Sequence, residues 1–442
     1  MNAFNQSMQL FGLRRTWQFA RRNSVFYRDR LPDLDDGEVS FDALARLPVL
    51  TKAELSDHAL DIYGDHDVPH AILFTGGTTG RPQIIPVTSE EVAIRNATAH
   101  SGEISDGPTP LTLITGGGSQ GRITPTGQNQ GTICVPLRSR TGYEWAWRML
   151  VSEHRFRGAA SRVTRIALPL PAIKKLVNFA AERGLDRTAL AVETVLSFSS
   201  YISKGWRKRI EEFFDARLVD CYGFTEAPVA RALQSDASGY FHMPEGVIAE
   251  FLELDGTAPV DSGFARMCVT TLYPQTQSAI LIRYDPGDIV QLGPVCPQTG
   301  TRGFLPKGRR HHSVAIQHNG RTIYPIFATD IQEAVDIHHW VARSSNLRHG
   351  GVTASEDDSW PKWRLSPDHG TEGGPTPIRV EIELTSSPAF FHEEWNILHD
   401  HIHCTIMEEN PTLGQMVAAG MVQLNVCGVP PGTIAENEII RC

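Results

Sequence analysis

Apolar and polar positions follow helical spacing over the first part of the chain. Residues 10–30 carry apolar side chains at helical spacing with arginines on the other face, which predicts a helix. Residues 40–60 predict two short helices, because Pro48 separates two helical patterns and Ser40 and Thr51 are suitable N-caps. The chain therefore begins with helices rather than with a sheet.

Strand and helix patterns then alternate through the middle of the chain. The expected strands are residues 71–74, 111–114, 131–137, 189–200 and 216–222, and the expected helices are residues 143–154, 171–184 and 203–216. This alternation predicts an α/β protein with a mixed or parallel sheet. Residues 263–273 and 278–284 have the alternating pattern of two hairpin strands.

A domain boundary is predicted near residues 303–310, where the pattern changes. The segments that follow are a β-rich piece at 311–325, a helix at 328–342, a long loop at 343–377 rich in Gly, Ser, Asp and Pro, a strand at 378–384, a helix at 391–407 and a strand at 421–426. We therefore expect a large N-terminal domain over residues 1–307 and a small α+β domain over residues 308–442.

Composition narrows the class of protein. The chain has 442 residues, 41% hydrophobic and 21% charged, as in ordinary globular enzymes. No run of 18 apolar residues and no secretion signal is found, so we expect no membrane span. The net charge of −9 does not favour a nucleic-acid partner. Seven scattered cysteines without CxxC spacing favour a reducing cytoplasm over disulfides or a cysteine zinc site.

The first candidate for chemistry is the Gly/Thr-rich loop after residues 71–74. Its members are Thr75, Gly76, Gly77, Thr78, Thr79, Gly80 and Arg81. Backbone N–H groups and hydroxyls of such a loop form a nest for phosphates, and Arg81 adds a cation. A Walker loop is excluded, because no Lys-Ser/Thr follows the last glycine. The alternative is a solvated turn.

Three further motifs could carry chemistry. In CYGFTEAP (221–228), Glu226 could hold Mg²⁺ near a phosphate, or the strand could simply lead into a helix cap at Thr225. In LIRYDPGDIVQL (281–292), Asp288 could accept both hydroxyls of a ribose, or Asp285 and Asp288 could be ordinary turn residues. Arg309 follows Gly308 at the expected domain junction, where the alternative is a solvated basic linker.

Taken in order, these motifs resemble the adenylate-forming superfamily of acyl-CoA synthetases, adenylation domains and luciferases, and most of all its phenylacetate-CoA ligase branch. The motifs that carry the resemblance are NSVFYRDR (23–30), LARLPVLTKAEL (44–55), FTGGTTGRP (74–82), YGFTE (222–226), GYFHMPEGVIAEF (239–251), VTTLY (269–273), RYDPGD (283–288) and Gly308-Arg309. They span nearly the whole chain.

The resemblance implies a two-step reaction. A carboxylic acid attacks the α-phosphate of ATP to give an acyl-adenylate and pyrophosphate, and a thiol of coenzyme A or of a carrier-protein pantetheine then takes the acyl group. The small C-terminal domain is expected to swing between the two steps. The acid is expected to be aromatic or heteroaromatic, the pathway a specialised one, and a homodimer is common in this branch.

The resemblance also implies roles for residues. The loop 75–81 would hold the β- and γ-phosphates, Thr225 would lie near the α-phosphate and Glu226 would bind Mg²⁺. Tyr222, followed by Gly223, would stack on adenine, Asp288 would bind the ribose, and Arg309 would assist at ribose or phosphate. The segment 197–200, with Ser199 and Ser200, would line the adenine and acyl sites.

The chain departs from the family pattern at its C-terminal end. The family's adenylation lysine would fall near residues 435–437, yet no lysine follows Lys362. The position of the family's hinge residue matches His311 best. Two alternatives therefore stay open: an adenylating enzyme that passes the acyl group to an amine, a nitrogen species or a downstream enzyme, and a relative that binds nucleotide with reduced catalysis.

Overall fold

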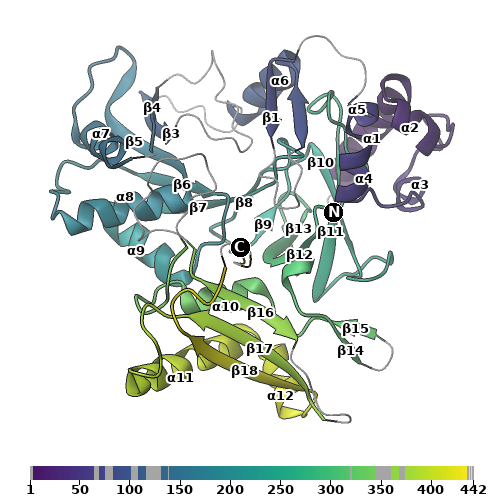
Figure 1. The fold of residues 1–442 in the computed structure, drawn as a ribbon. Helices are drawn as coiled ribbons and strands as arrows, with labels where there is room; N and C mark the ends of the chain where they lie inside the picture. The colour runs from purple at the N-terminus through teal and green to yellow at the C-terminus, as the bar shows by residue number, and fades with distance from the viewer. Residues whose placement is uncertain are drawn as a thin grey trace. The chain divides into compact units, whose positions relative to one another are not determined.

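The computed structural model describes residues 3–63, 69–74, 83–100, 108–115, 131–137, 139–318, 321–344, 360–367, 374–435, 438 and 440 (Figure 1). The chain packs as two compact units: unit 1 is Met1–Val135, Ser152–Ala167 and Val219–Leu305, and unit 2 is Pro136–Val151, Leu168–Leu218 and Pro306–Cys442. The predicted boundary between two domains after residue 307 stays a prediction. The segment Pro306–Cys442 packs in one unit with two earlier segments, Pro136–Val151 and Leu168–Leu218. No described helix is long and apolar enough to span a bilayer.

Unit 1 combines a helical N-terminal region with most of a large mixed sheet. Its helices are α1 (Ala3–Asn23), α2 (Val25–Arg30), α3 (Phe41–Ala45), α4 (Lys52–Asp57), α5 (Ala59–Ile62) and α6 (Ser89–His100). Its strands are β1 (Ala71–Phe74), β2 (Ile84–Val87), β3 (Thr109–Thr115), β4 (Thr132–Val135), β8 (Ala232–Gln234), β9 (Phe241–His242), β10 (Val247–Leu252), β11 (Phe264–Thr271) and β12 (Asp288–Val295). Strands β5 (Ala159–Pro169), β7 (Arg217–Tyr222) and β13 (Arg302–Arg309) each run from one unit into the other.

The strands of unit 1 pair in both senses, which confirms the predicted α/β class with a mixed sheet. β3 pairs in parallel with both β4 and β5. β10, β11 and β12 form an antiparallel meander, and β7, β8 and β9 form another. The separate pair β1–β2 is antiparallel.

Local capping sets the helix ends near the N-terminus. Ser40 and Thr51 cap α3 and α4 as predicted, and Thr51 and Glu54 form a reciprocal capping box. The single helix predicted over residues 10–30 is wrong in one respect. The side chain of Ser24 accepts a hydrogen bond from the Tyr27 amide, which starts α2 as a new helix.

The hairpin strand predicted over residues 278–284 is also wrong. This segment makes only two isolated bridges, from Tyr284 to Leu50 and to Val269. Arg283 adopts φ +53°, which breaks the extended backbone. Side-chain oxygens replace the missing strand partner, because the amides of residues 281–283 donate to hydroxyls of Thr271, Tyr27 and Thr270.

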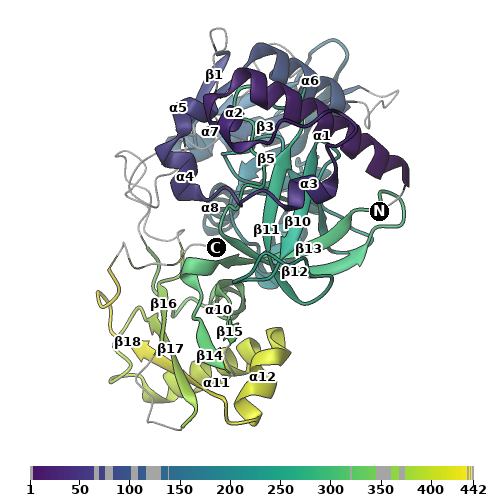
Figure 2. The same cartoon turned by 90° about the vertical axis from the view of Figure 1, so that its right-hand side faces the viewer.

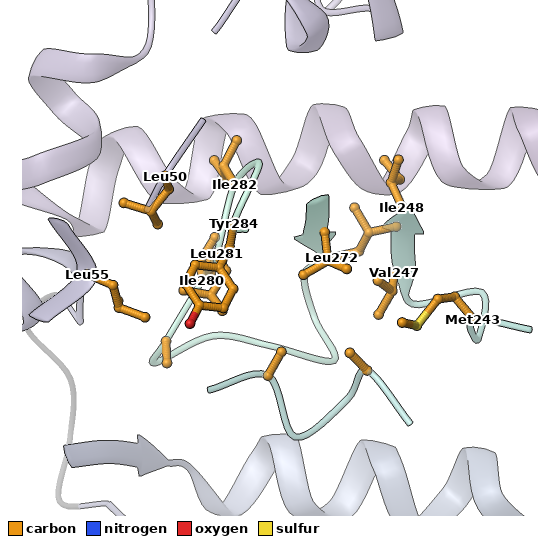
Figure 3. Packing of buried hydrophobic residues seen from close by; sticks show 14 of the residues in the cluster. Leu50, Leu55, Met243, Val247, Ile248, Leu272, Ile280, Leu281, Ile282 and Tyr284 are labelled. Atoms are coloured by element: carbon orange, nitrogen blue, oxygen red, sulfur yellow. The ribbon is translucent and has the colours of Figure 1, made fainter. Parts of the chain in front are cut away.

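The core of unit 1 lies between α1 and the strands that follow β9. Gln9 donates to the carbonyl of Val247, and the amide of Tyr273 donates to Thr16, so α1 lies beside β10 and the end of β11 (Figure 2). Figure 3 shows Ile248 and Ile282 facing this helix. This packing anchors the turn that leads into β12.

Unit 2 joins helices from the middle of the chain to the C-terminal segment. Its earlier elements are α7 (Arg140–Val151), α8 (Leu170–Glu182), β6 (Thr194–Phe198) and α9 (Lys204–Phe214). The C-terminal segment contains η1 (Arg310–His312), β14 (Ile316–His318), β15 (Arg321–Ile323), α10 (Ala328–Val335), β16 (Trp363–Pro367), β17 (Thr376–Glu383), α11 (His392–Glu409), α12 (Pro411–Ala418) and β18 (Val422–Val429).

The C-terminal segment has the predicted α+β composition. β17 pairs antiparallel with β16 and parallel with β18, and α10, α11 and α12 pack on this sheet around one apolar core. The loop predicted over residues 343–377 is wrong at its end, because it contains β16 and the start of β17. Trp363 anchors β16, since its ring is fully buried and its indole N–H donates to Gln332.

Candidate functional site

Two predicted nucleotide motifs meet in unit 1 through Tyr222 and Asp288. Tyr222 ends β7 and Asp288 begins β12. The Tyr222 hydroxyl donates a hydrogen bond of 2.5 Å to Oδ2 of Asp288, 66 residues further along the chain. The Tyr222 ring packs edge-on against Phe304 at 5.4 Å and Phe241 at 6.2 Å between centroids. The aromatic packing fixes the ring, and the ring's hydroxyl fixes the carboxylate.

The turn before Asp288 is built by its buried neighbours. Asp285 is 3% exposed, accepts a 2.7 Å hydrogen bond from the Gly287 amide and contacts Arg266 at 3.3 Å. Arg283 is 2% exposed and contacts Glu250. Both side chains are therefore structural, whereas Asp288 is partly exposed.

Glu226 is a buried carboxylate in the turn after β7. Its side chain is 7% exposed, and Nζ of Lys52, the first residue of α4, lies 3.2 Å from its Oε1. Burial, together with the charge of Glu226, raises the pKa of Tyr63. The Tyr63 hydroxyl is buried and makes no hydrogen bond to any described residue. Thr225, the preceding residue, is partly buried, and Gly223 is exposed.

The predicted phosphate loop, Thr75–Arg81, lies outside the described residues. The strands on either side of it, β1 and β2, are described and pair from Ala71 with Val87 to Phe74 with Ile84. Gln83, just after the loop, donates to the Lys52 carbonyl at 3.3 Å. Gln83 is therefore bonded to the same residue whose ammonium pairs with Glu226.

Three of the predicted site residues belong to unit 2: Ser199, Ser200 and Arg309. Ser199 is exposed with φ +79°, and the hydroxyl of Ser200 is buried without a hydrogen bond to a described residue. Arg309 ends β13, and its carbonyl accepts a 3.2 Å hydrogen bond from Ser313. Gly308 has φ +106°, and a Cβ there would lie 2.9 Å from Cβ of Ala328. The glycine therefore fixes the backbone entry to Arg309.

His311 and His312 follow Arg309 in η1. Their ring centroids are 4.0 Å apart. Burial lowers the pKa of His312 to about 4, and the charges of His311 and Arg309 add to this effect. Both rings line a cavity of about 390 Å³ in unit 2 that also has Arg364 and Glu438 on its wall. Arg364 is itself neutralised by Glu381 and Glu438.

Sequence reasoning did not assign two residues of this site, Lys52 and Tyr63. Lys52 stands in the LARLPVLTKAEL motif, but nothing in the sequence shows that it reaches Glu226. Within the described parts of the chain, no group of three or more His, Cys, Asp or Glu side chains could hold a metal ion by itself.

Comparison with solved structures supports the fold. No protein-family model matches the sequence, and no curated protein matches it. The structure of 2-hydroxyisobutyryl-CoA ligase in the postadenylation state with 2-HIB-AMP matches over 99% of this chain and 88% of that chain, with TM-score 0.67 and 16% identity. An open conformation of that ligase with 2-HIB-AMP and CoA gives TM-score 0.64 at 17% identity over 98% and 89%.

A second kind of protein shares the fold. The structure of McyG A-PCP complexed with phenylalanyl-adenylate matches over 85% of this chain and 66% of that chain, with TM-score 0.50 and 13% identity. The chain therefore has the fold of the adenylate-forming enzymes, as the motifs predicted.

Proposed function

We propose that this protein is an AMP-forming acid ligase. A carboxylate oxygen of the substrate attacks the α-phosphorus of ATP, the bond to the β-phosphate oxygen breaks, and an acyl-adenylate and pyrophosphate result. The hydrogen bond between Tyr222 and Asp288 carries the proposal, because it joins the two motifs expected at adenine and ribose. The fold shared with 2-hydroxyisobutyryl-CoA ligase supports it.

Each site residue has a role that its chemistry permits. Asp288 accepts hydrogen bonds from the ribose hydroxyls through its carboxylate oxygens, and Tyr222 holds that carboxylate and presents its ring to adenine. The loop Thr75–Arg81 receives the β- and γ-phosphates. Thr225 donates to the α-phosphate. Catalysis then consists of positioning the acid and stabilising charge at the phosphorus.

Glu226 fits a Mg²⁺ site completed by substrate. Mg²⁺ commonly binds one or two protein carboxylates together with phosphates and waters. Glu226 supplies one carboxylate, and Lys52 balances its charge at 3.2 Å. When bound, Mg²⁺ would supply positive charge to the phosphates. Arg309 assists at the ribose or at a phosphate. Ser199 and Ser200 line the adenine and acyl sites.

The finer assignments belong to the same proposal. The acid is aromatic or heteroaromatic, and coenzyme A or a carrier-protein pantetheine takes the acyl group. The segment 308–442 is a small mobile domain that changes position between the two steps. An acceptor other than a thiol is the outcome to look for if the adenylate forms without a thioester.

The test is pyrophosphate release with ATP and Mg²⁺ over a panel of aromatic, heteroaromatic and aliphatic acids, with and without coenzyme A. We expect acid-dependent release and a CoA thioester. Asp288→Asn should raise KM for ATP, whereas Asp261→Asn, at a fully exposed side chain, should not. Absence of both acid-dependent release and ATP binding in the wild-type protein would overturn the proposal.

A further inference from the structure

An ionic contact within unit 2 joins the C-terminal segment to helices α8 and α9. Its centre is Asp336, which directly follows α10 and is fully buried. Nζ of Lys174, on α8, lies 2.8 Å from Oδ1 and 2.7 Å from Oδ2 of Asp336. The Ser203 hydroxyl donates to Oδ2 at 2.8 Å, and Arg343 donates to Oδ1 at 3.2 Å. Both carboxylate oxygens are therefore held by charged or hydroxyl donors.

A second carboxylate one turn earlier makes the same kind of contact. Glu333, on α10, accepts a 2.7 Å hydrogen bond from the Tyr201 hydroxyl and a 2.9 Å hydrogen bond from the Lys204 amide. The Lys204 ammonium in turn pairs with Glu409, at the end of α11. The C-terminal segment thus presents three carboxylates, and α8 with the start of α9 presents ammonium, hydroxyl and amide donors.

The charges favour an ionised Asp336 in the closed contact. Burial acts to raise the pKa of its carboxyl, but Lys174, Arg343 and the hydrogen bond from Ser203 outweigh burial and hold the pKa below its usual value. A buried ion pair gains attraction at the expense of hydration. When the two surfaces part, Lys174 and Ser203 leave Asp336 and return to water, whereas Arg343, which lies in the C-terminal segment, keeps its contact with Oδ1. Rehydration of the separated charges offsets part of the attraction that is lost.

Building on the proposed function, we propose that Asp336, Lys174, Ser203 and Glu333 form a latch. The latch holds the C-terminal segment on α8 and α9 during one half-reaction and opens for the other. Asp336 is a positioning residue in this proposal, because it acts through the place of the segment and not on the substrate. Its loss should separate the two half-reactions and not merely lower stability.

The structure offers a direct way to hold the latch closed. A Cβ built on Gly205, in the first turn of α9, would lie 3.5 Å from Cβ of Ile337, which follows Asp336. Disulfides have Cβ–Cβ distances of about 3.5–4.5 Å. Gly205→Cys alone would bring that Cβ within 2.3 Å of Cγ2 of Ile337, so the double variant also removes the clash. Ile337 is 47% exposed and accessible to an oxidant.

The experiment compares the double variant Gly205→Cys/Ile337→Cys in oxidised and reduced form. Diamide closes the disulfide and dithiothreitol opens it. The first half-reaction is followed by acid-dependent ATP–pyrophosphate exchange, and the second by transfer of a preformed adenylate to coenzyme A. The single variant Ile337→Cys, treated in the same way, corrects for the six free cysteines of the described residues.

We expect oxidation to lower one half-reaction at least tenfold and to leave the other within twofold, with recovery on reduction. Two unchanged half-reactions, or two equally lowered ones, would overturn the latch. If the reduced and wild-type proteins show no acid-dependent exchange, the proposed function fails instead, and the latch is then judged by the disulfide yield alone.

Disulfide yield under limiting diamide tests the latch without any activity. In the double-cysteine background, Lys174→Met or Asp336→Asn should lower the rate of disulfide formation at least fivefold, because the closed state becomes less populated. Lys362→Met is the matched control, since it removes a half-buried lysine paired with Glu383 inside the C-terminal segment. An equal rate in all these variants would overturn the latch.

Discussion

Replacing Tyr222 by phenylalanine isolates the contact on which the proposed nucleotide site depends. The change removes one hydroxyl and keeps the ring, which packs on Phe304 and Phe241. The lost hydrogen bond has a carboxylate acceptor, and such bonds contribute about 1.5–3 kcal/mol. Since 1.4 kcal/mol corresponds to about tenfold in an equilibrium constant, kcat/KM for ATP should fall by about 10- to 100-fold.

The assay is acid-dependent pyrophosphate release at varied ATP, repeated with 2′-deoxy-ATP. If Asp288 binds the ribose hydroxyls, the wild-type enzyme prefers ATP, and Tyr222→Phe reduces that preference because the carboxylate is no longer held. Most of the loss should appear in KM. Tyr143→Phe is the matched control, because the Tyr143 hydroxyl makes only a 3.5 Å contact with the Leu137 carbonyl and belongs to no predicted site.

Two results would refute this reasoning. An unchanged KM for ATP in Tyr222→Phe, with thermal stability also unchanged, would show that Asp288 needs no positioning by Tyr222. An unchanged preference for ATP over 2′-deoxy-ATP in Asp288→Asn would remove Asp288 from the ribose. If kcat/KM and Tm fall together in Tyr222→Phe, and Tyr143→Phe shows the same joint fall, the loss reflects packing and not the nucleotide site.

Three further predictions concern stability. Lys52→Met leaves the buried Glu226 carboxylate without its cation, so the free energy of unfolding should fall by about 1–2 kcal/mol. Addition of Mg²⁺ with ATP should raise the Tm of this variant by more than it raises the Tm of the wild type. Gly308→Ala should lower the free energy of unfolding, measured with urea, by about 1–3 kcal/mol. Alanine is strained at φ +106°, and its Cβ would lie 2.9 Å from Cβ of Ala328. Burial and neighbouring basic side chains lower the pKa of His338 to about 4. As the pH falls below about 6.5, the unfolded chain therefore binds a proton at this histidine, whereas the folded chain binds it only near pH 4. Stability should therefore fall by about 1–2 kcal/mol between these pH values after discounting for partial exposure, and His338→Gln should flatten that part of the pH profile.

Local signals in the sequence predicted most elements of the fold, and the errors have local causes. N-caps at Ser40 and Thr51 are chemical signals within a few residues, so the helices behind them could be placed. The break at Ser24 carries the same signal, but the apolar period runs through it and favoured one helix. The expected strand at residues 278–284 failed because Arg283 takes a backbone conformation that its residue type does not indicate.

Contacts between distant segments could not be predicted in the same way. Lys52 and Glu226 each lie in a motif that the sequence makes visible, but their 3.2 Å ion pair depends on how α4 packs beside the turn after β7. The same holds for Asp336, which the sequence shows only as a residue within the helix predicted over residues 328–342. Its importance comes from Lys174 and Ser203, two positions on other helices or their ends.

Burial decides which charged residue of RYDPGD can meet a ligand. The sequence analysis selects Asp288 for the ribose and leaves open that Asp285 and Asp288 are ordinary turn residues. Arg283 and Asp285 are almost fully buried and use their charges on Glu250 and Arg266, so a bound nucleotide would have to break those pairs to reach them. Asp288 is partly exposed, and the Tyr222 hydroxyl donates to one of its two carboxylate oxygens. A carboxylate has about four acceptor sites on its two oxygens, so a partly exposed carboxylate can accept from the hydroxyls of a ribose, which is what the proposed site requires.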